Sequence, residues 1–275
     1  MMKQGAGSRE QEAGEREQEA KDNSCFSLCA SSFPLNGVFI TGTDTDAGKT
    51  VAAAAVLVSM RAAGIDAVPM KPVQTGAMWQ DGRMRSPDLA FCLRMAELRP
   101  DKEELDEMVP CIYEPACSPH LAAAKAGREI SFDLISEAFH RLLEKHESVV
   151  VEGAGGLLAP IDASRTMVDL MSMLKLPVIL VSRPGLGAIN HSLLSIRELE
   201  RSNLSLHGII FCETTGAGFG EIERDNIETI ARMGKAKVLG CIGHMPGLTE
   251  ISPRIFRNLA AEYLPIQWIE TRDQK

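Results

Sequence analysis

The sequence has no hydrophobic run near the roughly 20 residues that crossing a bilayer requires. Its first 22 residues, MMKQGAGSREQEAGEREQEAKD, lack the apolar core of a secretory signal peptide. It also has no run of basic residues, and it carries a net charge of −8 with an isoelectric point near 5.4. We therefore expect a cytoplasmic protein that binds neither membranes nor nucleic acid.

Paired cysteines are also missing. The seven cysteines are odd in number and scattered, with no CxxC spacing. Cys25 and Cys29 form a single CxxxC without a nearby histidine, which is a weak signal for a metal or redox pair. Reduced thiols are the expectation for all seven: Cys25, Cys29, Cys92, Cys111, Cys117, Cys212 and Cys241.

The N-terminal segment has almost no apolar side chains. Its first 22 residues contain four basic and six acidic side chains, and such a composition cannot bury enough surface to offset the entropy of folding. We expect a disordered extension over residues 1–35. With 45% hydrophobic residues in the whole chain, residues 36–275 are predicted to form one domain.

Short β-branched runs alternate with helical patterns along the rest of the chain. Strands are predicted over residues 37–41, 66–72, 148–156, 176–182, 206–211 and 236–242, and helices over 48–64, 86–98, 131–146, 189–202 and 221–233. Ser86 is expected to cap the second helix, with Pro87 in its first turn. This order predicts an α/β fold of the P-loop NTPase type, in which helices cover both faces of a mostly parallel sheet. Ligands then bind beyond the carboxyl ends of the strands.

The stretch GTDTDAGKT, from Gly42 to Thr50, resembles the phosphate-binding pattern GxxxxGK[ST] but has one residue more between its glycines. In that pattern backbone N–H groups surround phosphate, the lysine neutralises the outer phosphates and the hydroxyl holds Mg²⁺. Asp44 and Asp46 would repel a triphosphate unless they point away, bind metal or face a cationic substrate. The loop therefore predicts a nucleotide site with an additional function for its acidic residues.

Other strands also end in residues with useful chemistry. Lys71 follows the second strand, Glu152 follows three valines, and residues 182–190 follow the strand at 176–182. We expect these positions to meet Lys49 and Thr50 in one crevice. Glu152 and Asp88 could complete a magnesium shell with Thr50.

Each of these residues also has a structural interpretation. Lys71 could be solvated, and Asp88 could only complement the dipole of its helix. His120 and His191 show no metal or nucleophile pattern, so structural or substrate-positioning roles are expected for them.

Six stretches closely resemble the dethiobiotin synthetase family: GTDTDAGKT, KPVQTG, SPDLAF, EPACSPHLAA, VVVEGAGGLLAPI and LPVILVSRPGLGAINHSLL. They occur in the family's order over about residues 36–248. The resemblance implies that 7,8-diaminononanoate, CO₂ and ATP react, with Mg²⁺, to form dethiobiotin, ADP and phosphate. It also implies a homodimer, and a cationic diamine would explain the acidic residues of the loop.

The resemblance also assigns residues. It implies that Lys49 and Lys71 are catalytic and that Thr50, Asp88 and Glu152 hold Mg²⁺, while Thr75 contacts substrate. A helix N-terminus from the neighbouring subunit would bind the substrate carboxylate. The implied nucleotide-binding residues are Thr45, Asp46, Ala47, Gly48, Lys49, Thr50 and Asp88, and the implied carboxylate-binding residues are Gly187, Ala188, Ile189 and Asn190.

Two departures from the family concern base recognition. The family commonly has an asparagine for adenine where this chain has Cys212, Glu213 and Thr214, and the stretch GCIGHMPGL differs from the usual IPxL. These departures leave the preference for the nucleotide base open.

Three rival functions stay open. An NTPase switch of the ParA or MinD kind has a second lysine near the start of its loop, where this chain has Asp44 and Thr45. A cobyrinate-type amide synthetase normally has a glutaminase domain, for which the chain after Leu248 is too short. A nucleotide sensor without chemistry would have no use for Lys71, Asp88 and Glu152.

Overall fold

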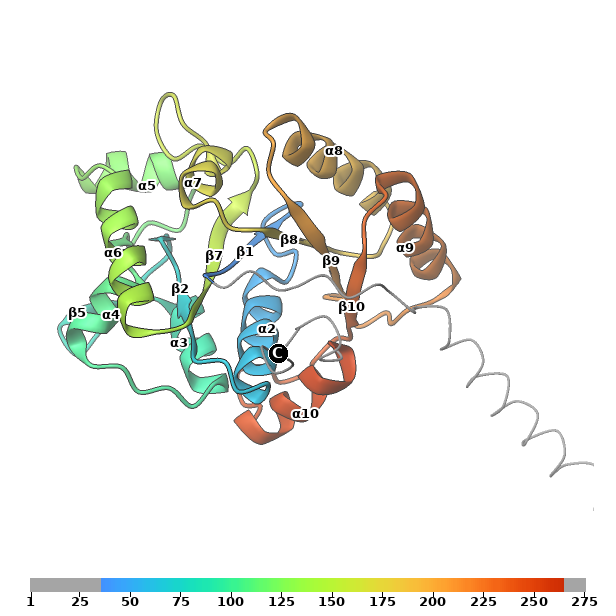
Figure 1. Ribbon diagram of the computed structural model, residues 1–275, viewed down its shortest axis with the longest axis horizontal. Coiled ribbons are helices and arrows are strands. Elements are labelled where there is room, and N and C mark those ends of the chain that lie inside the picture. The colour runs from blue at the N-terminus through green and yellow to red at the C-terminus, as the bar shows by residue number, and fades with distance from the viewer. Residues whose placement is uncertain (1–35, 265–275) are drawn as a thin grey trace, which may run out of the picture. The chain divides into compact units, whose positions relative to one another are not determined.

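The structure is a computed structural model that describes residues 36–264. Within this range, six parallel strands form the central sheet in the order β10-β9-β8-β1-β7-β2 (Figure 1). The expected N-terminal extension, together with Cys25 and Cys29, lies outside the described residues. The strands are β1 (Gly37–Gly42), β2 (Ala67–Met70), β7 (Ser148–Gly156), β8 (Val178–Ser182), β9 (Leu206–Cys212) and β10 (Val238–Ile242).

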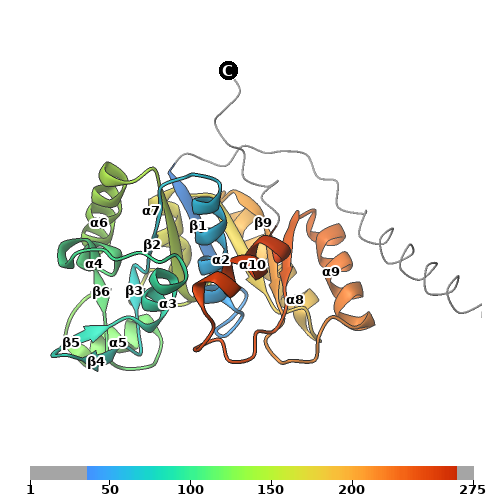
Figure 2. The same ribbon diagram turned by 90° about the horizontal axis from the view of Figure 1, so that it is seen from below.

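Helices cover both faces of the sheet because both faces of its central strands are apolar. In β1, Val38 and Ile40 belong to one buried cluster and Phe39 to the other. One face packs against α2 (Lys49–Ala62), α3 (Pro87–Met95) and α10 (Pro253–Tyr263). The opposite face packs against α6 (Phe132–Lys145), α7 (Met167–Leu174), α8 (Ala188–Arg201) and α9 (Glu221–Gly234), and Figure 2 shows this layering from below. The predicted α/β fold is confirmed.

Smaller elements lie along the chain between β2 and α3 and between α3 and α6. A two-stranded sheet pairs β3 (Val73–Gln74) with β6 (Cys111–Ile112), and β4 (Met78–Gln80) with β5 (Arg83–Arg85) form an exposed hairpin. The helices α4 (Lys102–Met108) and α5 (Pro119–Ala126) complete this part. None of the helices between residues 36 and 264 combines the length and the apolar character that crossing a bilayer would require.

The start of α3 confirms a detail that the sequence predicts. Ser86 is the N-cap residue and Pro87 is the first helical residue. The backbone N–H of Leu89 donates to the Ser86 hydroxyl at 3.0 Å. This cap satisfies one of the free N–H groups in the first turn of α3. It also fixes the direction in which the Asp88 side chain projects from the helix.

Candidate functional site

The candidate site lies at the carboxyl ends of β1, β7 and β2. Strand β7 lies between the other two, so the loop after β1, Glu152 on β7 and Lys71 after β2 are neighbours. They line a cleft of about 1030 Å³, together with residues of α8 such as His191 and Ser195. Three of the four strand ends that were expected to meet in one crevice do so, whereas residues 182–188 after β8 line a second pocket.

The loop from Gly42 to Thr50 wraps the start of α2. Gly48, the N-cap residue of α2, has a left-handed backbone with φ of 96°. A Cβ atom at this position would lie 2.5 Å from the Cβ of Cys212, so the backbone of the loop approaches β9 more closely than a side chain permits. Ala47 beside it is buried. The sequence at this turn is therefore fixed by space as well as by backbone conformation.

Lys49 lies at the first position of α2 with only 8% of its surface exposed. Its ammonium donates to the backbone carbonyl of Asp44 at 2.7 Å, within its own loop. Burial, and after it the positive charge of Lys71, lower the pKa of Lys49 from its usual value. The charge of Lys49 is thus held inside the loop, where an anion would stabilise it.

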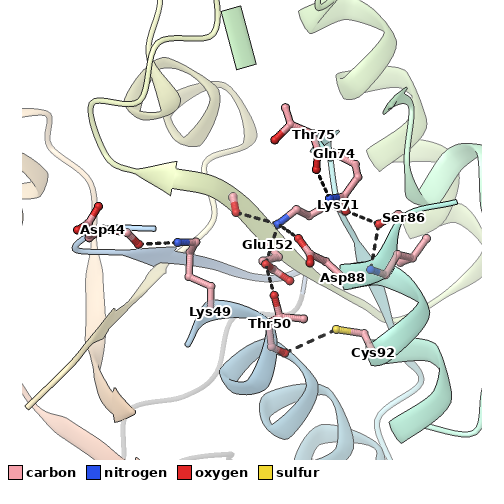
Figure 3. A network of polar contacts seen from close by, with 12 residues as sticks. Asp44, Lys49, Thr50, Lys71, Gln74, Thr75, Ser86, Asp88, Cys92 and Glu152 are labelled. Atoms are coloured by element: carbon pink, nitrogen blue, oxygen red, sulfur yellow. Dashed lines mark hydrogen bonds and ion pairs between the residues drawn. The ribbon is translucent and has the colours of Figure 1, made fainter. Parts of the chain in front are cut away.

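Lys71 is the centre of the polar network in Figure 3. Its ammonium lies 2.7 Å from Oε1 of Glu152 and 2.7 Å from Oδ2 of Asp88. It also donates to the carbonyl of Gly153 at 3.2 Å. Burial alone would lower the pKa of Lys71, but the carboxylates of Glu152 and Asp88 outweigh burial and raise it. Lys71 is therefore a buried ammonium whose charge its two carboxylate partners stabilise, and not a solvated side chain.

Thr50 joins the phosphate loop to this network. Its hydroxyl donates to Oε1 of Glu152 at 2.8 Å. The carboxylates of Glu152 and Asp88 thus meet the Lys71 ammonium directly, and the Thr50 hydroxyl joins them through Glu152. Hard oxygen atoms with two negative charges are the donor set that Mg²⁺ prefers.

Further predicted site residues line the cleft. They are Thr45 and Asp46 of the loop and Thr75, which follows β3, and their contacts with nucleotide and substrate stay a prediction. Asp44 also lines the cleft, and its carboxylate accepts from the N–H of Thr45 at 2.7 Å and lies 3.7 Å from the guanidinium of Arg183. One acidic residue of the loop therefore already faces a cation of the protein.

The predicted carboxylate-binding segment lies apart from the Lys71 network. Gly187 and Ala188 line a second pocket of about 250 Å³, and His191 lines both pockets. Gly187 is the N-cap residue of α8, while Ala188 is buried and uses its N–H in a 3.1 Å bond to the carbonyl of Gly185. Ile189 is half-buried and Asn190 is exposed. The structure therefore does not bring this segment into the Lys71 cluster of the same chain.

Sequence reasoning missed Gln74 and Ser86 as a pair. Both are buried, and the Ser86 hydroxyl donates to the side-chain carbonyl of Gln74. It also missed Glu213, whose carboxylate accepts from the N–H groups of Thr215 at 2.7 Å and Gly216 at 2.8 Å. The available signal for the first pair was the glutamine of KPVQTG. It stands in a stretch where polar residues are otherwise expected to be exposed.

The fold and the loop define a P-loop nucleotide-binding protein, and residues 36–252 match the family model of an AAA domain. Among curated relatives, the ATP-dependent dethiobiotin synthetase of Anaeromyxobacter dehalogenans strain 2CP-C is 41% identical over 180 residues, 66% of this chain and 78% of the relative. That of Halalkalibacterium halodurans is 37% identical over 215 residues, 78% of this chain and 87% of the relative. The chain belongs to the dethiobiotin synthetase family.

Proposed function

We propose that the chain makes dethiobiotin from 7,8-diaminononanoate, CO₂ and ATP in the cytoplasm. One amine takes up CO₂ as a carbamate, and the carbamate oxygen attacks the γ-phosphate of ATP and releases ADP. The second amine then attacks the carbonyl of this mixed anhydride, expels phosphate and closes the ureido ring. The observation that carries the proposal is the Lys71 ammonium, held by two carboxylates beside the phosphate loop in one cleft.

The lysines have charge-neutralising roles in this proposal. Lys49, the first residue of α2 and part of the phosphate loop, neutralises the outer phosphates of a nucleotide bound there. Lys71 stabilises both the carbamate and the phosphoryl group that the carbamate attacks. Both carry negative charge, and this charge shifts as the bond between carbamate oxygen and phosphorus forms. Thr75, on the rim of the same cleft, contacts the diamine.

We further propose that Thr50, Asp88 and Glu152 hold Mg²⁺. The proposal is supported by the Asp88 and Glu152 carboxylates, which both pair with the Lys71 ammonium, and by the Thr50 hydroxyl, which donates to Glu152. A bound Mg²⁺ would neutralise charge on the phosphates. Thr50 and Glu152 already share a hydrogen bond, so the ligand set is partly oriented by the protein itself.

A product assay tests the reaction. The purified protein is given the diamine, bicarbonate, Mg²⁺ and ATP, and dethiobiotin and phosphate are measured together. We expect the two products in equal amounts, with phosphate release that requires the diamine. Phosphate release that ignores the diamine would contradict the proposal and favour an NTPase switch.

The substrate carboxylate is proposed to bind the start of α8 from a neighbouring subunit of a homodimer. This assignment is supported by the place of the segment, which lines a second pocket outside the Lys71 cluster. Free N–H groups and the dipole of a helix N-terminus favour a carboxylate.

Mixed dimers test the shared site. A Lys71→Ala subunit is mixed with an Asn190→Glu subunit, since Asn190 is exposed whereas Ala188 is buried. If the site is shared, some mixed dimers contain one intact site and activity returns. Lys71→Ala mixed with Glu152→Gln is the control, because both changes lie in the same cleft and cannot complement. If Lys71→Ala/Asn190→Glu heterodimers are shown to form and activity still does not return, the shared site is contradicted.

A further inference from the structure

Lys71 and Asp88 form a close pair, yet the chain between them is exposed for much of its length. Residues 78–83, most of the β4–β5 hairpin, are exposed, and Met78 is 58% and Trp79 is 60% exposed. A hairpin of two short strands has little stability of its own. The position of Asp88 relative to Lys71 therefore needs a connection that bypasses the hairpin.

The side chain of Gln74 makes that connection. Gln74 lies on β3, three residues after Lys71, and Ser86 caps α3 two residues before Asp88. The Ser86 hydroxyl donates to Oε1 of Gln74, and this hydrogen bond closes the base of the loop that contains the hairpin (Figure 3). Both side chains are buried, with 3% of Gln74 and 5% of Ser86 exposed.

Only one orientation of the Gln74 amide fits its neighbours. Its Nε2 donates to the carbonyl of Thr75 at 2.7 Å, so Oε1 must face Ser86. Ser86 accepts from the N–H of Leu89 and has a single proton, which it gives to Gln74. Each hydrogen bond between Thr75 and the first turn of α3 therefore has a fixed donor and a fixed acceptor.

The hydrogen bonds of the Gln74 side chain go to Thr75 and Ser86 and not to the charged network. Gln74 is therefore not a reactant. It borders the cleft, while the cations and carboxylates are contributed by Lys71, Asp88 and Glu152. A second contact supports α3 from the other side, where the Cys92 thiol lies 3.9 Å from the carbonyl of Thr50. Burial raises the pKa of Cys92 well above its usual value, so this thiol is a packing group.

We propose that Gln74 is a positioning residue for the reaction. Its amide holds the N-terminus of α3, and with it the Asp88 carboxylate, on the Lys71 ammonium, and it fixes the Thr75 backbone at the same time. The inference rests on the proposed dethiobiotin synthesis. Small displacements of groups that orient a reaction lower turnover strongly, whereas the phosphate loop, which Gln74 does not contact, continues to bind nucleotide.

The kinetics of two variants test this role. Gln74→Met keeps the volume of the side chain and the Ser86 cap but removes both amide hydrogen bonds. We expect kcat to fall about tenfold or more while KM for ATP stays within about twofold. Ser86→Thr, which keeps the hydroxyl donor and the cap, should retain most of the wild-type kcat.

A double-mutant cycle separates the link from the helix cap. If Gln74 and Ser86 act through one bond, the loss in kcat of Gln74→Met combined with Ser86→Ala should be smaller than the product of the two single losses. Ser131→Ala removes an equivalent cap from α6, where Leu134 donates to Ser131 at 3.1 Å, and should lower stability without changing kcat.

Two results would overturn the inference while leaving the proposed function intact. One is a wild-type kcat in folded Gln74→Met. The other is a double variant whose loss in kcat equals the product of the two single losses. If the wild-type protein forms no dethiobiotin at all, the proposed function fails, and the inference fails with it.

Discussion

The backbone of Gly48 packs directly on the side chain of Cys212. A Cβ added to Gly48 would lie 2.5 Å from the Cβ and 2.9 Å from the Sγ of Cys212. The thiol in turn lies 3.8 Å from the Gly48 carbonyl. The last glycine of the phosphate loop is therefore fitted to β9, a strand that is far from it in sequence.

We expect Gly48→Ala to lower the free energy of unfolding by about 2 kcal/mol or more, because it combines a left-handed backbone with overpacking. Cys212→Gly should recover part of this loss in the double variant, since it removes the Cβ that would collide. Cys212→Ala keeps that Cβ and is the matched control, with little recovery expected. Urea unfolding measures all four proteins. A Gly48→Ala protein as stable as wild type would contradict the close contact.

Removing either lysine of the cleft should lower turnover by about two orders of magnitude or more, because each neutralises charge that grows in the transition state. The variants are Lys49→Ala and Lys71→Ala, and dethiobiotin formation is the measurement. Lys125→Ala, an exposed change near the end of α5, is the control and should leave the rate unchanged. A wild-type rate in Lys71→Ala would remove Lys71 from the mechanism.

Selectivity for the nucleotide base should be weak. Cys212 faces Gly48, and the carboxylate of Glu213 is engaged by the N–H groups of Thr215 and Gly216. Neither side chain offers the amide that could donate and accept at an adenine edge. The ratios of kcat/KM for ATP, GTP and CTP test this expectation. A preference for ATP above about a hundredfold would show that other groups recognise the base.

Asp162 should make stability depend on pH. The backbone N–H of Ser164, aided by Arg165 and opposed by slight burial, lowers the pKa of Asp162 to about 2. A depressed carboxyl pKa stabilises the fold above about pH 4, and this stabilisation is lost as the pH falls towards 2. Asp162→Asn should therefore cost about 1 kcal/mol at pH 6, a value discounted because the side chain is 32% exposed, and progressively less below pH 4.

Urea unfolding at pH 6, 4 and 3 measures that difference. Asp225→Asn, on the exposed side of α9, removes the same charge and should change stability little at each pH. An Asp162→Asn difference that stays constant from pH 6 to pH 3 would show that the hydrogen bonds of the turn, and not the charge, stabilise it.

The sequence was sufficient for elements whose local signals agree. Ser86 followed by Pro87 predicts the start of α3 correctly, and three valines before Glu152 predict β7. These features depend on caps and apolar runs, which act between near neighbours in the chain. The three strand ends met as expected because parallel strands align their carboxyl ends on one edge.

Long-range side-chain contacts could not be predicted in the same way. Nothing in the local pattern says that Ser86 gives its proton to Gln74, or that Arg183 faces Asp44. The short hairpin β4–β5 was also missed, because strands of three residues carry too little pattern to be recognised. Such contacts depend on how segments pack and not on their own composition.

The central place of β7 has a consequence for how the protein is made. Residue Gly37 of β1 pairs with Val149, and Ala67 of β2 pairs with Ser148, so the strand that carries Glu152 joins its neighbours only after a long intervening segment has been synthesised. Contacts between residues so distant in sequence slow folding, because a large loop must close first. During synthesis the phosphate loop therefore leaves the ribosome long before its acidic partner. Because Glu152 lines the same cleft as Lys49 and Thr50, we expect nucleotide to stabilise chains in which β7 has been inserted over chains in which it has not.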